Sequence, residues 1–107
     1  MAPLRRRDNC FVLCVGGDQK LLETRAHVVE TTGASAVVVS DEKGIRKALK
    51  ATSICAAIIG HSFSLEEQAK FVSIIRDQVG EIPVLTLSRT VVHPDEIVSF
   101  VLTAIGG

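Results

Sequence analysis

Short apolar segments rich in Val and Ile alternate along the chain with longer segments whose apolar residues recur at helical spacing. The apolar segments occupy residues 10–15, 35–40, 54–60 and 82–88. The first three are continuously apolar rather than alternating, which is typical of strands buried on both faces of a parallel sheet. The pattern therefore predicts four strands separated by helices.

The remaining segments predict four helices, over residues 18–33, 40–52, 64–80 and 94–107. Asp18 suits an N-cap of the first helix and Gly33 the C′ position at its end. Pro94 suits the first position of the last helix. The residues of the first helix that repeat at helical spacing are Leu21, Leu22, Arg25, Val28, Val29 and Thr32.

The second and third helices carry signals of their own. Gly44 lies near the start of the second helix and predicts an irregular first turn, because glycine is unfavourable inside a helix. Ser64 and Glu67 have the spacing of a capping box at the start of the third. The core-facing stripe expected for that helix is Leu65, Ala69, Val72, Ile75 and Val79.

Alternating strands and helices with short connections predict right-handed βαβ units, and hence an α/β fold with an open parallel sheet covered on both faces. In such sheets ligands bind at the carboxyl ends of the strands. The residues that follow the predicted strands there are Gly16, Gly17, Gly60, His61, Ser62, Ser88 and His93.

Composition narrows the class of protein. The 107 residues suit one domain, and twelve basic residues balance twelve acidic ones, so no net charge favours nucleic acid or a membrane. Residues 1–8, which include Arg5, Arg6 and Arg7, are expected to form a flexible tail before a domain at 9–107. No apolar segment has the length of a membrane span or a signal peptide, which predicts a cytoplasmic protein.

The three cysteines, Cys10, Cys14 and Cys55, all lie within apolar segments. Their number and spacing do not match a disulfide framework or a zinc site. They are expected to be buried structural thiols.

With this order of strands and helices, the chain resembles a response-regulator receiver domain over residues 9–105. Receiver domains are the flavodoxin-like modules of two-component signalling. Receivers carry two adjacent acids after the first strand, where this chain has Gly16 and Gly17, with Asp18 one position later. The phosphoacceptor aspartate of the family ends the third strand, where this chain has Gly60 and His61. The resemblance implies a three-layer α/β/α sandwich whose acidic site has been lost.

Two further positions extend the comparison. Ser88 matches the Ser or Thr that ends the fourth strand of the family, and His93-Pro94 stands where the family has Lys-Pro. Receiver phosphorylation needs a carboxylate nucleophile, acidic ligands for Mg²⁺ and a lysine beside the phosphoryl group. Since glycine supplies no side-chain oxygen, we expect a degenerate receiver with no catalytic residue, no metal and no cofactor.

The chain is also too short for a complete receiver. Residues 89–93 cannot hold both a crossover helix and a fifth parallel strand, because such a crossover needs a dozen or more residues. We therefore expect strand order 2-1-3-4, a fifth strand that is absent or atypical, and no fourth helix of the family. That order leaves segment 82–88 at an edge. It predicts self-association through that edge or through the surface that the missing helix leaves uncovered, with exchange of the last helix between copies as a variant.

The sequence leaves three functions open. The first is a non-phosphorylatable signalling module that binds proteins, itself included. The second is a sensor of a small anion or nucleotide, with ligand-binding residues Gly16, Gly17, Asp18, Gly60, His61, Ser62 and Ser88. The third is an enzyme or phosphocarrier that uses His61 or His93. The resemblance favours the first, a protein without enzymatic activity.

Overall fold

The computed structural model describes residues 11–87 and 93–106. The expected tail at 1–8, Ser88 and most of the segment at 89–93 lie outside the described residues. The strands are β1 (Phe11–Val15), β2 (Ser35–Val39), β3 (Ile54–Ile59) and β4 (Val84–Thr86). The helices are α2 (Gln19–Glu30), α3 (Glu42–Ala51), α4 (Leu65–Val79) and α5 (Pro94–Gly106).

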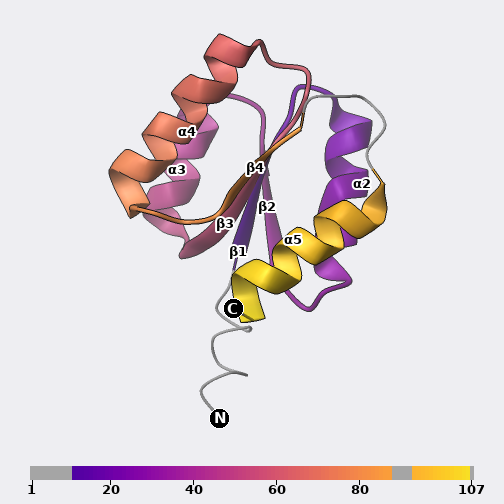
Figure 1. The fold of residues 1–107 in the computed structure, drawn as a ribbon. Coiled ribbons are helices and arrows are strands. Elements are labelled where there is room, and N and C mark those ends of the chain that lie inside the picture. The colour runs from indigo at the N-terminus through magenta and orange to yellow at the C-terminus, as the bar shows by residue number, and fades with distance from the viewer. Residues whose placement is uncertain (1–10, 88–92, 107) are drawn as a thin grey trace.

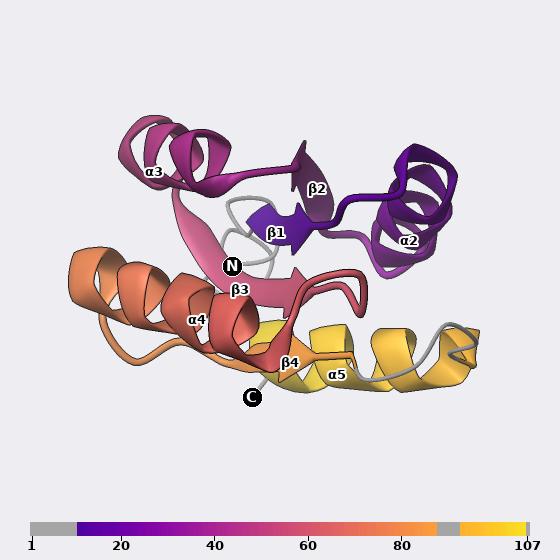
Figure 2. The same cartoon turned by 90° about the horizontal axis from the view of Figure 1, so that it is seen from above.

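The four strands form one parallel sheet in the order β2-β1-β3-β4, as predicted. Helices α3 and α4 cover one face of the sheet, and α2 and α5 cover the other (Figure 1). The view from above shows the same three layers, with the sheet between the two helix pairs (Figure 2). The flavodoxin-like α/β/α sandwich expected from the sequence is confirmed.

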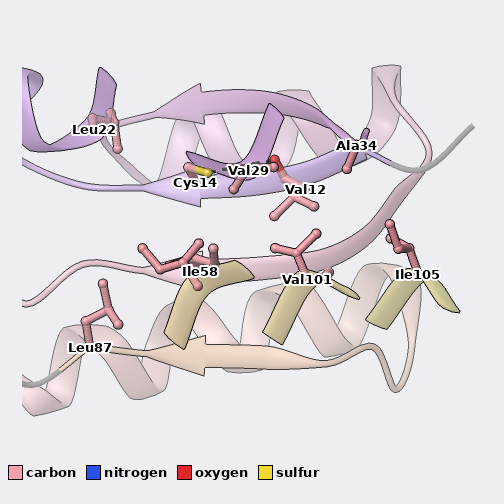
Figure 3. Close-up of a cluster of buried hydrophobic side chains, with 11 residues drawn as sticks. Val12, Cys14, Leu22, Val29, Ala34, Ile58, Leu87, Val101 and Ile105 are labelled. Carbon is pink, nitrogen blue, oxygen red and sulfur yellow. Dashed lines mark hydrogen bonds between the residues drawn. The ribbon is translucent and has the colours of Figure 1, made fainter. Parts of the chain in front are cut away.

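Alternate residues of β1 supply the two halves of the core. Val12 and Cys14 face α2 and α5 and belong to the cluster shown in Figure 3. Leu13 and Val15 face α3 and α4 and belong to the second cluster. All four side chains are almost fully buried. The central strand is thus apolar on both faces, which explains its continuous apolar sequence.

The edge strand β4 is shorter than the predicted segment 82–88, since its ladder covers only Val84–Thr86. Pro83 directly precedes the strand and cannot donate a hydrogen bond, because proline has no backbone N–H. Its carbonyl accepts a hydrogen bond from the Ala57 N–H at 3.0 Å. At the other end, the Leu87 N–H donates to the Ile59 carbonyl at 2.8 Å. The strand therefore pairs with β3 along a short stretch at the edge of the sheet.

The predicted core stripe of α4 is wrong at its start. Leu65 is 81% exposed and Ala69 is exposed, whereas the buried residues are Gln68, Phe71, Ile74 and Ile75. A stripe chosen by apolar residues alone excludes glutamine, although Gln68 faces the sheet. The capping box of Ser64 and Glu67 is present as predicted.

Two predictions about glycines are wrong. Gly33 has a positive φ of 94°, but it follows the C-cap Thr31 by two residues and is therefore not at C′. Gly44 lies in the first turn of a regular α3. Its N–H donates to the Asp41 carboxylate at 2.8 Å, and a Cβ there would lie 3.0 Å from that of Val39. Close packing against β2 accounts for this glycine.

The cysteines differ from one another. Cys14 is buried with a free thiol, as expected. Cys55 is half-buried and disulfide-bonded, so the prediction of a structural thiol is wrong at that position. Spacing along the chain does not show which sulfur atoms meet in space. Cys10 lies outside the described residues.

None of the helices in the described ranges combines the length and apolar character needed to cross a membrane.

Candidate functional site

The predicted site residues that the structure describes gather where β1 and β3 end side by side. Gly16 and Gly17 follow β1, and Gly60, His61 and Ser62 follow β3. The Gly17 N–H donates to Ser62 Oγ at 3.1 Å, which links the two loops. The structure therefore places these two predicted loops side by side.

The glycine pair does not present free amides to an anion. The Gly16 N–H donates to the Val39 carbonyl at 3.1 Å, and the Gly17 N–H is taken by Ser62. A Cβ at Gly16 would lie 2.8 Å from Leu22 Cδ1. The pair is therefore explained by a tight turn against α2, and the prediction that these amides bind an anion is not supported by their hydrogen bonds.

Asp18 acts as the N-cap of α2, as predicted. Its Oδ1 accepts from the backbone N–H groups of Lys20 and Leu21 at 3.0 and 3.3 Å. These bonds satisfy helix amides that would otherwise attract an anion, and the carboxylate itself is negative. The N-terminus of α2 is thus already occupied by a side chain of the protein.

Arg25 was predicted only as one of the residues at helical spacing on α2, without a role in the site. It lies on the sheet-facing side of α2 and is 7% exposed. Its Nη2 lies 3.5 Å from His61 Nδ1, and its Nη1 lies 3.0 Å from where a Cβ of Gly60 would be. Helical side chains lean toward the N-terminus of their helix, so the guanidinium reaches the carboxyl end of the sheet. A cation therefore lies against Gly60, at the end of β3.

The charge of Arg25 has no acidic partner among the described residues at ion-pair distance. Burial lowers the pKa of the guanidinium, while Cys14 and Asp18 raise it. Arginine nevertheless stays protonated in proteins. Burial, opposed by Arg25, raises the pKa of the neighbouring Cys14 thiol from 9.0 to about 12, so the thiol is neutral at pH 7 and does not balance the charge.

Gln68 approaches the same strand end from the other face of the sheet. It is 6% exposed, and its Nε2 donates to the carbonyls of Gly60 and Leu87 at 2.8 and 2.9 Å. These bonds fix the end of β3 to the residue that follows β4. A polar residue at a core-facing position was the sequence signal for both Gln68 and Arg25.

The two remaining predicted residues are Ser88 and His93. Ser88 lies outside the described residues. His93 is exposed at the start of α5, where its Nδ1 lies 3.5 Å from Asp95 Oδ2 and accepts from the Asp95 N–H at 3.4 Å. Within residues 11–87 and 93–106, no three His, Cys, Asp or Glu side chains are grouped so that they could hold a metal ion.

No protein-family model matches the chain, and no curated protein matches it in sequence. Two similar solved structures are de novo designed Rossmann fold proteins, each 24% identical. One has a TM-score of 0.55, with 89% of this chain and 95% of the design covered. The other has a TM-score of 0.52, with 92% and 99% covered. At this level of identity the similarity shows a shared Rossmann-type α/β fold.

Proposed function

We propose that this chain is a receiver-like signalling module that is not phosphorylated and acts by binding other proteins, including a second copy of itself. The observation that carries the proposal is the pair Gly60 and Arg25. Position 60 offers no carboxylate, and the space beside it holds Nη1 of a buried guanidinium.

Electrostatics supports the same conclusion. Transfer of a phosphoryl group to an aspartate requires Mg²⁺ held by oxygen ligands next to the nucleophile. Here the nearest side chain to Gly60 is a cation, which repels a divalent metal ion. Asp18, the acid closest in sequence to the glycine pair, is committed to capping α2.

Incubation of the full chain with acetyl phosphate and Mg²⁺ tests the loss of phosphorylation. We expect no covalent mass increase, with an active receiver domain as the positive control for the phosphoryl donor. A Mg²⁺-dependent gain of one phosphoryl group would overturn the proposal. Mass is the proper readout because a non-covalent anion leaves it unchanged.

The edge of the sheet supports self-association. Pro83 and Leu87 bond toward β3, and backbone groups alternate sides along a strand, so the Thr86 N–H points away from β3. An unpaired edge is a template for pairing with another chain. Helix α5 and the β4 edge lie on the part of the molecule where a receiver has one more strand and helix.

Light scattering across the micromolar range tests this interface. We expect a mass above that of the monomer for the native chain and a shift toward monomer for Thr86→Pro, which removes the outward N–H. Thr86→Val keeps that N–H and is the matched control. A native chain that stays monomeric throughout the range would rule out pairing through this edge.

A further inference from the structure

The buried guanidinium of Arg25 has far more hydrogen-bonding capacity than the protein uses. Arginine offers five N–H donors and no acceptor. In the described part of the chain its one hydrogen-bonding contact is with the His61 imidazole, at 3.5 Å. Burying a charge is costly unless it is paired. The site therefore carries a positive charge that has no ion-pair partner among the described residues.

The candidates for an internal counterion do not fill that role. The Asp18 carboxylate accepts from two amides of α2, and no ion pair joins it to Arg25. The Cys14 thiol is protonated at neutral pH, as its burial dictates. Among the described residues, therefore, no side chain forms an ion pair with Arg25 that would balance its charge.

The guanidinium is also within reach of solvent. In the described residues no side-chain nitrogen is both sealed from solvent and without a hydrogen-bond partner. The nitrogens of Arg25 that do not contact His61 are therefore not sealed. The guanidinium lies beside Gly60 and half-buried His61 at the carboxyl end of the sheet, where ligands bind in folds of this class. Exposed Ser62 follows His61 in the same loop.

We propose that Arg25, with His61 and Ser62 beside it, binds a small oxyanion such as phosphate at the carboxyl end of β3. The guanidinium supplies paired N–H donors that match the oxygens of a phosphate group. The Ser62 hydroxyl accepts from Gly17 and retains its own hydrogen for donation.

This site differs from an anion cradle of backbone amides at Gly16 and Gly17, because those amides are already bonded. It is also independent of protein binding by the module. Failure to bind phosphate leaves the lack of phosphorylation untouched, and a covalent mass increase with acetyl phosphate would not remove the anion site.

The test is an NMR titration of the full chain with sodium phosphate against sodium chloride at matched ionic strength and pH 7. We expect saturable shifts at the amides of Gly60, His61 and Ser62. Arg25→Met should weaken binding at least about tenfold, as expected for loss of charged hydrogen bonds. Arg46→Met removes an exposed arginine of α3 and should leave the affinity unchanged.

A second variant tests the same site in case Arg25→Met does not fold. Ser62→Ala removes one exposed hydroxyl and should weaken phosphate binding about fivefold, as expected for one neutral hydrogen bond. A titration with AMP shows whether the site binds phosphate as the free ion or as a monoester. Saturable shifts of the same amides with either compound support the site. Shifts that do not saturate, or that persist unchanged in a folded Arg25→Met protein, would overturn the proposal.

Discussion

The end of β3 is contacted from its two faces by two buried polar side chains that are partnered very differently. On the α4 side, Gln68 donates to two backbone carbonyls. On the α2 side, Arg25 meets one imidazole nitrogen. Both residues are more than nine-tenths buried. Gln68 and Arg25 are therefore similarly buried but differ in how many hydrogen bonds the protein gives them.

The difference identifies which side of the strand end is structural and which is available for binding. A buried amide whose hydrogen bonds go to the protein stabilises the fold and has little left to offer a ligand. A buried cation without an acidic partner costs stability and gains from an anion. The α2 side is accordingly the place where this protein is best suited to receive a ligand.

The largest effect is expected from Gln68→Leu. Leucine is similar in size to glutamine but has no N–H group. The buried carbonyls of Gly60 and Leu87 therefore lose this hydrogen-bond donor. The free energy of unfolding should fall by about 2–4 kcal/mol, since each unsatisfied buried group costs about 1–3 kcal/mol. Urea denaturation measures the change.

Gln78→Leu is the matched control for that variant, because Gln78 is exposed on the same helix. Its effect on the free energy of unfolding should stay within about 0.5 kcal/mol. If Gln68→Leu were equally harmless, the account of Gln68 as a clamp on the strand ends would be wrong.

An intermediate effect is expected from pH at Cys14. Because burial raises the thiol pKa from 9.0 to about 12, the unfolded chain loses this proton before the folded one does. The protonated Cys14 thiol therefore makes its full contribution to stability below pH 9, and this contribution is lost as pH rises from 9 toward 12. From the linkage relation, native stability relative to Cys14→Ala should fall by about 1.4 kcal/mol between pH 8 and pH 10.

Urea denaturation of both proteins at the two pH values measures this difference, and comparing the pair cancels the titration of lysines. A stability difference that does not change with pH would mean that the thiol ionises as easily in the folded chain as in the unfolded one.

The architecture was predictable because its signals are local. The continuous apolar runs around Val12–Val15 and Ile54–Ile59 indicate strands buried on both faces, and short connections then fix a parallel sheet. The caps at Asp18 and Ser64 were predictable for the same reason, since each bonds to amides within three residues.

The chemistry of the site was less predictable because it depends on contacts distant in sequence. Gly17 meets Ser62 across 45 positions and Arg25 meets His61 across 36, and no local pattern shows either contact. The pattern of the first helix includes Arg25 at helical spacing but assigns it no chemical role, and the stripe of the third helix omits Gln68 because glutamine is not apolar. Polar residues on an otherwise apolar stripe were the available signal.

The smallest expected effect tests most directly the central claim that the buried charge of Arg25 has no counterion within the protein. Arg25→Met keeps the long apolar stem of the side chain and removes the buried charge. Measured by urea denaturation in chloride buffer without phosphate, the variant should match the native free energy of unfolding or exceed it by up to about 1 kcal/mol. Arg46→Met, which breaks an exposed pair with Glu42, should lose less than about 1 kcal/mol.

A loss of about 3 kcal/mol or more in Arg25→Met would contradict the account, because it is the cost of breaking a buried ion pair. Arg25 would then already have a counterion within the protein. A stability equal to or above that of the native chain would show that the charge at the end of β3 is not balanced from within.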